Sequence, residues 1–415
     1  MIKKIIVSIC LLFSLTMLAQ QGTASPYSYY GVGEIKFRGT FDNRAMGGLS
    51  IFTDSTHVNI QNPASTASLK LVNFTLGGMY GTTKSETTTE SGTNNRSSID
   101  YIAGGIPMGR FGAYFGVLPY TTVGYNEHFY DSTTQIDKKS TGIGGINKGF
   151  FGLGFKIISN LSVGLDFNYN FGGISTKDIV YKNDVQYGSR ESNNSDISGV
   201  NYNAGLMWNS KVGKNSRLFA SFRYTPQSDL KSENTRNIAT VKPSAAADPP
   251  VVESQDVVVE NTTMILPRRI SAGAGFGEER KWLIGAEFTL SDSDGFSNRF
   301  SDINGSSFKT SRRYIVGGYY IPKHNSYNNY FKTITYRAGI RYDSAGLIVK
   351  EEPINEAAFT LGAGLPVGGR FSNVNVGLEF GQRGTTNAGL VKETFFNFMV
   401  SFSLNDQWFA KRKFN

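Results

Sequence analysis

Six charged residues stand out because each takes a small or polar position in a segment that alternates with large apolar residues. They are Asp166, Arg223, Glu287, Arg337, Arg341 and Glu379. Charges inside a closed fold need partners, so we expect these side chains to form a hydrogen-bonded network that holds an N-terminal hatch in place, with Asp166 close to the arginines. A sharper hypothesis is that Arg337 or Arg341 binds the carboxylate of a ligand through its paired N–H donors.

The sequence contains no recognisable motif for catalysis or for metal binding. His57, His128 and His324 are far apart, and there is no nucleophile elbow, zinc-protease motif or phosphate loop. Residues 273–277 are rich in glycine but lack the dinucleotide-binding spacing, so we expect a strand with small residues facing inward. We therefore expect no enzymatic activity, no cofactor and no bound metal.

The element that would point these charges inward is a long β-strand, seen most clearly at residues 161–172. Every odd position there is large and apolar, and every even position is small or polar. A period of two places the two sets on opposite faces of a strand. The length matches the roughly 9–11 residues that cross a bilayer at a tilt. Ordinary strands are shorter, at about 5–6 residues.

The alternation recurs from residue 72 onward and predicts about fourteen strands. Short turns alternate with longer stretches rich in Ser, Thr, Asn and Asp, at residues 82–98, 126–141, 175–194, 227–261 and 291–311. Short turns at one end and long loops at the other are typical of outer-membrane barrels. The pattern predicts an all-β fold, an antiparallel transmembrane β-barrel. The alternatives are a secreted two-sheet sandwich, which would not need such long strands, and a β-helix, for which the sequence shows no fixed short repeat.

The N-terminus has the features of an export signal. Lys3 and Lys4 precede an apolar run that ends near residue 17, so residues 1–20 are expected to be a cleaved signal peptide. Cys10, the only cysteine, lies in that segment, which excludes disulfides and thiolate metal sites from the mature chain. We expect a plug, or hatch, at residues 21–70, a barrel at 71–405 and a basic-aromatic periplasmic tail at 406–415.

The segment before the first strand carries short motifs of a known family. An Ala-Met-Gly-Gly stretch ending at Gly48 is followed by Asn62, Pro63 and Ala64, and Leu266-Pro267 opens a later strand. In these features the chain resembles the FadL family of long-chain fatty-acid transporters. Its C-terminal stretch, from Phe380 onward, is similar to Bacteroidetes members. The resemblance implies a fourteen-stranded barrel with an N-terminal hatch, in which Asn62, Pro63 and Ala64 are the hatch motif.

The resemblance also implies that the third strand has a break through which ligands leave the lumen sideways. The third expected strand contains Pro119, followed by Gly124. Proline removes a donor from the hydrogen-bond ladder and is found at strand edges or bulges. A lateral gate at Pro119 and Gly124 is therefore one hypothesis. The other is that Pro119 simply ends the strand.

Two functions follow from the resemblance. The first is non-enzymatic passage of hydrophobic small molecules across the outer membrane of a Gram-negative bacterium. The alternative is a non-transporting barrel subunit of an outer-membrane protein-assembly or secretion complex. The expected partners are outer-membrane lipid, a hydrophobic ligand or such machinery. Nucleic acid is not expected, although the net charge of the chain is +9, because the chain is exported.

Overall fold

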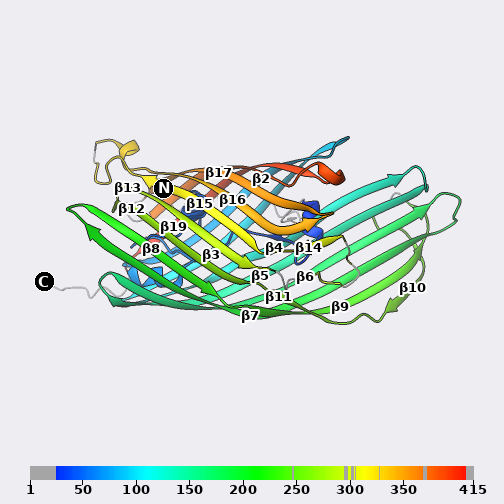
Figure 1. Cartoon of the computed structure of the whole chain (residues 1–415), viewed down its shortest axis with the longest axis horizontal. Helices are drawn as coiled ribbons and strands as arrows, with labels where there is room; N and C mark the ends of the chain where they lie inside the picture. The colour runs from blue at the N-terminus through cyan, green and yellow to red at the C-terminus, as the bar shows by residue number, and fades with distance from the viewer. Residues whose placement is uncertain are drawn as a thin grey trace, which may run out of the picture.

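The computed structural model describes residues 25–407, apart from 245–246, 294–297, 301–302, 304, 327 and 368–371. The expected signal peptide, residues 21–24 of the expected hatch and residues 408–415 of the expected tail lie outside this part. The described strands join into one sheet whose last strand pairs with its first wall strand, so the barrel is closed (Figure 1). The predicted fold class is confirmed.

Fourteen antiparallel strands form the wall of the barrel. They are β2 (Val72–Glu86), β3 (Ser91–Met108), β4 (Phe111–Asp131), β5 (Ile136–Ile158), β6 (Leu161–Lys182), β7 (Gly188–Val212), β8 (Ser216–Thr225), β12 (Arg268–Glu278), β13 (Trp282–Asp292), β15 (Ser311–Tyr320), β16 (Thr335–Val349), β17 (Glu352–Val367), β18 (Ser372–Arg383) and β19 (Lys392–Asp406). Four further strands extend it, namely β9 (Ser228–Val241), β10 (Val251–Val257), β11 (Thr262–Leu266) and β14 (Ser306–Phe308).

Several stretches that were expected to be loops are strands. β6 and β7 continue through most of residues 175–194, and only 183–187 connect them. The expected loops at 82–98 and 126–141 are likewise continuations of hairpins. Outside the apolar band the outer face of a strand meets water instead of lipid, so the residues there no longer alternate in hydrophobicity although the backbone pairing continues. These hairpins project from one end of the barrel (Figure 1).

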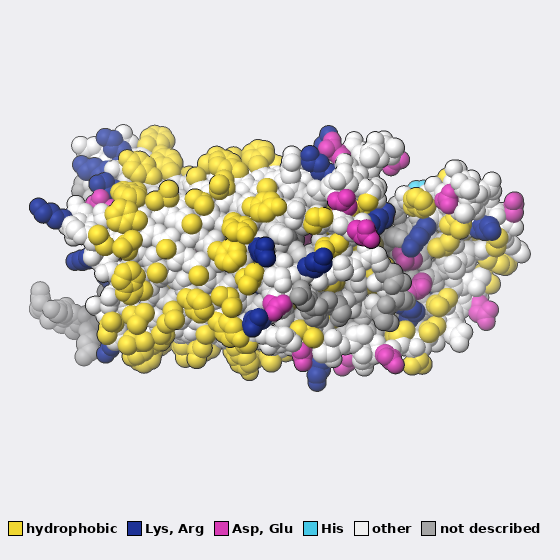
Figure 2. All heavy atoms as spheres, in the orientation of Figure 1, with side chains coloured by type: hydrophobic (Ala, Val, Ile, Leu, Met, Phe, Trp, Pro, Cys, Tyr) yellow, Lys and Arg dark blue, Asp and Glu magenta, His cyan; other side chains and the backbone are white. Residues whose placement is uncertain are grey.

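The outer surface has an apolar band over the half of the barrel that carries the short turns (Figure 2). On β6, Leu165, Phe167 and Tyr169 face outward, and Leu165 is 67% exposed. Asp166 and Asn168, between them, are buried in the interior. A continuous apolar girdle around a polar interior is the surface that a membrane-spanning barrel presents to lipid. Among the described helices, none has the length and apolar character of a membrane span.

The described residues before β2, numbers 25–71, lie inside the barrel, and we call them the hatch. They contain η1 (Pro26–Tyr29), β1 (Glu34–Ile35), α2 (Phe41–Arg44) and η2 (Pro63–Ser68). Residues 39–51 are buried without exception. Four elements this short bury little surface against one another, so the wall must hold the hatch in place.

A row of glycines across four neighbouring wall strands receives η2. Gly112, Gly154, Gly164 and Gly205 lie opposite one another on β4, β5, β6 and β7. A methyl group at Gly164 would overlap the backbone of Pro63 and Ala64. Asn62 caps η2 by accepting a hydrogen bond from the Ala64 N–H at 3.1 Å, and it donates to the Leu206 carbonyl at 3.3 Å. The Asn62-Pro63-Ala64 motif therefore docks the hatch on this row.

A second glycine row receives the middle of the hatch. Its members are Gly275, Gly285, Gly317 and Gly339, on β12, β13, β15 and β16. Methyl groups at Gly317 and Gly339 would overlap the Met46 backbone, and those at the other two would overlap Ile51. The expectation that residues 273–277 form a strand with small inward-facing residues is confirmed.

Candidate functional site

A cavity of 310 Å³ lies between the hatch and the wall, and most of its polar lining is charged. Strand β1 borders it, together with side chains from both sides of the barrel. Its charged residues include Glu34, Lys36, Arg38, Arg44, Arg96, Asp100, Lys148, Arg223, Glu287, Arg313, Arg341, Asp343, Glu356, Glu379 and Arg383. The arrangement of these charges decides what the lumen can bind or pass.

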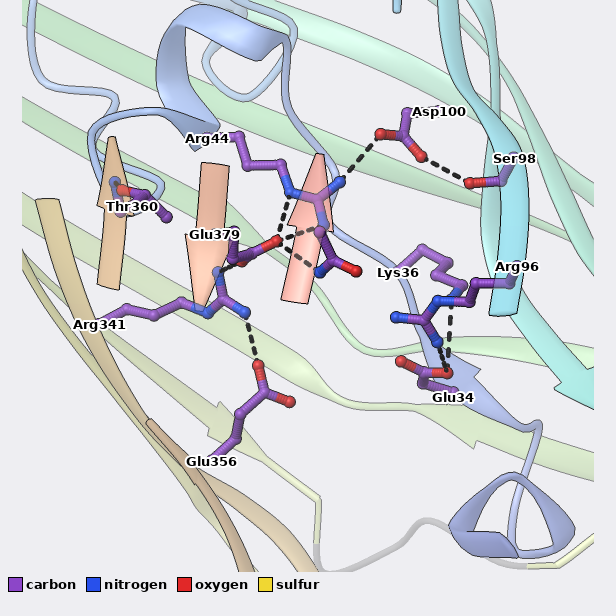
Figure 3. A network of polar contacts seen from close by, with 12 residues as sticks. Glu34, Lys36, Arg44, Arg96, Ser98, Asp100, Arg341, Glu356, Thr360 and Glu379 are labelled. Atoms are coloured by element: carbon purple, nitrogen blue, oxygen red, sulfur yellow. Dashed lines mark hydrogen bonds and ion pairs between the residues drawn. The ribbon is translucent and has the colours of Figure 1, made fainter. Parts of the chain in front are cut away.

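Glu379 of β18 is the centre of the largest ion-pair network (Figure 3). It is completely buried and accepts from Arg44 of α2, whose Nη2 lies 2.6 Å from Oε2. Arg341 of β16 pairs with the other carboxylate oxygen, and Asn397 donates to the carboxylate at 2.9 Å. Arg44 also reaches Asp100 of β3 at 2.9 Å. Arg44 of the hatch thus links β18 to β3, which lie on either side of the β19–β2 pair that closes the barrel.

The network continues to strand β1 of the hatch. Arg341 pairs with Glu356 of β17 at 2.5 Å. Arg383 of β18 pairs with Glu393 at 2.7 Å and with Glu34 of β1 at 3.1 Å. Glu34 also pairs with Lys36 at 3.3 Å and with Arg96 of β3 at 3.5 Å. A continuous set of charges therefore joins the hatch to β3, β16, β17, β18 and β19.

Two further predicted residues fasten the hatch at other points. Glu287 pairs with Arg223 and accepts hydrogen bonds from the Ser50 N–H and hydroxyl at 3.0 and 2.9 Å. Arg337 pairs with Asp42 of α2 at 2.5 Å. Arg337 and Arg341 are thus both occupied by carboxylates of the chain itself, and this geometry does not favour the hypothesis that either one binds a ligand carboxylate.

The expectation that Asp166 lies among arginines is wrong. Its carboxylate accepts hydrogen bonds from the Tyr114 hydroxyl at 2.7 Å, from Asn168 at 2.5 Å and from Asn203 at 2.7 Å. These donors come from β4, β6 and β7. The register between strands, which hydrophobic alternation does not reveal, decides which polar side chains meet.

The wall is unpaired next to Pro119. β3 and β4 are joined only from the pair Met108–Phe111 to the pair Ile102–Val117, and the ladder between β4 and β5 has a bulge just after Pro119. β4 nevertheless continues to Asp131, so the alternative that Pro119 ends the strand is wrong.

The hatch occupies the free edge of β4 on the inside. Ile35 and Glu34 pair with Thr121 and Thr122, and the Lys36 N–H donates to the Tyr120 carbonyl at 3.0 Å. Further along the same edge, the Gly124 N–H donates to the Ser28 hydroxyl at 3.2 Å. Pro119 and Gly124 thus lie at a gap in the wall that strand β1 covers.

Burial and neighbouring charges shift two hatch side chains from their usual protonation ranges. Burial opposes the charged form of His57, but the carboxylates of Asp42 and Asp54 outweigh it and raise its pKa to about 9. Burial lowers the pKa of Lys36 to about 8, although Glu34 acts in the opposite direction. In the described part of the chain, no group of three or more His, Cys, Asp or Glu residues could hold a metal ion.

Sequence reasoning missed several residues of this site. Glu356, Arg383 and Lys148 lie on the polar faces of alternating strands, so the rule that identified Glu379 could have found them. Arg44 and Glu34 lie in the hatch, which has no periodic pattern to mark a buried charge.

Comparison with known proteins gives a fold likeness and a family. The Pseudomonas putida toluene transporter TodX has 17% identity and a TM-score of 0.62, over 89% of this chain and 99% of that one. The Ralstonia pickettii toluene transporter TbuX has 15% identity and a TM-score of 0.59, over 89% and 99%. A Pseudomonas aeruginosa FadL homologue has 13% identity and a TM-score of 0.58, over 91% and 99%. At these identities the likeness is one of fold.

No curated protein matches the sequence. The family model that matches is BamG rather than FadL, and the match extends over residues 1–415. The resemblance to FadL is therefore borne out for the fold, while the family is a different one. The chain belongs to the BamG family.

Proposed function

We propose that this chain is a non-enzymatic barrel of a Gram-negative outer membrane and acts as a subunit of a protein-assembly or secretion complex. The observation that carries the proposal is the ion-pair network from Glu379 to Glu34, which fastens the hatch to five wall strands. A hatch held in this way closes the lumen. The barrel then serves as a rigid body that presents surfaces to partners.

Passage of a hydrophobic molecule through this lumen carries an energetic cost. To pass, it would have to separate buried pairs such as Arg44–Glu379, and each broken pair costs about 3–5 kcal/mol.

Two further features support the role of a complex subunit. The matching family model is BamG and not one named for a transporter. The hairpins of β4 to β7 extend well beyond the apolar band and carry polar side chains, which suits contact with another protein. A Bacteroidetes origin stays a prediction from the C-terminal stretch.

Passage of a hydrophobic molecule is the second candidate, and the unpaired edges of β3 and β4 favour it. The gap lies beside the cavity, because Leu118, Pro119 and Tyr120 line both. Opening it would require β1 to leave the edge of β4. Solved barrels of similar fold include toluene transporters.

The two functions can be separated by locking β1 in place. Ile35 and Thr121 are paired across the gap, so the double variant Ile35→Cys/Thr121→Cys would join hatch and wall under oxidising conditions. The subunit proposal expects the locked protein to be recovered from mild detergent in a large complex, as the wild type is. If the barrel is a transporter, toluene uptake into cells should stop on oxidation and return when a reductant is added. Recovery of the wild type alone, together with uptake that the lock abolishes, would refute the subunit proposal.

A further inference from the structure

Two cations in the cavity, one buried and one partly buried, share one aromatic ring. Arg38 comes from the hatch and Lys148 from β5, and both line the cavity together with Tyr120. The guanidinium carbon of Arg38 lies 5.2 Å from the centre of the Tyr120 ring, and Nζ of Lys148 lies 4.7 Å from it. Lys148 is only 7% exposed. Two positive groups therefore converge on one point of the lumen.

Neither cation has a carboxylate within ion-pair distance in the described part of the chain. The acids that act on them electrostatically are Asp343 and Asp166. Asp343 already pairs with Arg313, and Asp166 already accepts three hydrogen bonds.

The other buried cations of the cavity differ, since Arg44, Arg341 and Arg383 each have two or more carboxylates. A cation withdrawn from bulk water needs compensation by a counter-charge, by hydrogen-bond acceptors or by water. The site formed by Arg38, Tyr120 and Lys148 thus has a surplus of positive charge that faces an open cavity.

We propose that Arg38 and Lys148, on either side of Tyr120, bind the carboxylate or phosphate group of a small amphiphilic molecule in the lumen cavity. Arg38 presents a planar pair of donors and Lys148 a mobile ammonium group, which suits an oxyanion. Val32, Leu118 and Leu266 line the cavity and would contact an apolar portion. The volume of 310 Å³ lies at the lower end for small-molecule sites. This site goes beyond the proposed function, because it would be occupied whether the barrel supports partners or conducts.

The test is calorimetric titration of the full mature protein, purified in a neutral detergent, with three probes. Octanoate carries a carboxylate and octyl phosphate carries a phosphate, while octanol has the same chain without charge. We expect at least one of the two anions to bind at least tenfold more tightly than octanol. Octanoate and octyl phosphate also distinguish the two headgroup chemistries.

The variants Lys148→Gln and Arg38→Gln should each weaken binding of that anion about tenfold or more, since each removes a charged hydrogen bond. The matched control is Lys231→Gln, an exposed lysine on β9, which should bind as the wild type does. A change in the gel mobility of the protein on heating, which a folded barrel shows, confirms that each variant is folded.

Equal binding of octanol and both anions, or unchanged binding by both variants, would overturn the proposal. Recovery of the complex does not depend on this site, so failure here is distinguishable from failure of the proposed function.

Discussion

The hatch meets the two sides of the lumen by different means. Toward β16 to β19 it is held by buried ion pairs, with Arg44 on Glu379 and Asp42 on Arg337. Toward β4 to β7 it rests on a row of glycines, and the buried Asp166 of the nearby wall is hydrogen-bonded by a tyrosine and two amides of the wall instead of by the hatch. The first side resists movement because every charge has a partner. On the second side Arg38 and Lys148 have no carboxylate within ion-pair distance among the described residues, and the proposed anion site rests on this.

The largest expected effect is on the paired side, at Glu379. Glu379→Gln would leave the buried Arg44 and Arg341 without their shared carboxylate, and we expect the free energy of unfolding to fall by about 3–5 kcal/mol. Urea titration of the folded protein, recognised by its change in gel mobility on heating, measures this loss of free energy. The control is Glu86→Gln, which removes an exposed partner of Lys84 and should have no measurable effect. Equal loss in both variants would contradict the comparison.

The next effect is on pH dependence, through His57. Its pKa in the folded state is raised to about 9, from an ordinary 6.5, by Asp42 and Asp54 against burial and the charge of Arg337. A raised pKa contributes stability that is complete below pH 6.5 and is lost as the pH rises through 9. The loss should be no more than about 3 kcal/mol.

Urea midpoints measured from pH 6 to pH 10 would show this loss, and His57→Gln should flatten the curve. His128→Gln, which changes an exposed histidine at a hairpin tip, serves as the control. A wild-type curve that does not fall between pH 6.5 and 9 would disprove the assignment.

A comparable or smaller effect is expected where the hatch touches glycine. Gly164→Ala would place a methyl group against the backbone of Pro63 and Ala64, which cannot move aside easily. We expect a loss of about 1–3 kcal/mol and faster protease cleavage within the hatch. Gly92→Ala is the control, because a methyl group there meets nothing within 4 Å. If the two variants are cleaved at the same rate, the glycine row does not hold the hatch.

The smallest effect is expected on the unpaired side. Lys148→Gln removes a buried charge that has no carboxylate partner, so without ligand the free energy of unfolding should change by less than about 0.5 kcal/mol, or increase. Urea titration beside Lys231→Gln measures the difference. A loss close to that of Glu379→Gln would show that Lys148 has a structural partner after all, and the contrast between the two sides would disappear.

The barrel could be predicted from sequence because lipid imposes a strict alternation on every crossing strand. Residues 161–172 show this, and they lie within β6. The strand extensions could not be predicted, because polar residues on both faces leave no periodic signal. The charged residues of the site likewise include some that the sequence pattern identifies and some that it does not. Glu379 and Arg341 were identifiable by position, but their partner Arg44 lies in an aperiodic segment, and the neighbours of Asp166 depend on strand register.

Several residues that anchor the hatch lie far from it in the sequence, so they are synthesised much later than the hatch itself. The Gly47 N–H donates to Thr360, 313 residues away, and the Tyr27 hydroxyl donates to the Val391 carbonyl, 364 residues away. The segment that leaves the ribosome first therefore finds several of its binding partners in the strands that leave last. A chain cut short before β18 would lose the Glu379 anchor together with the closing strands, so a seated hatch is a marker of complete synthesis.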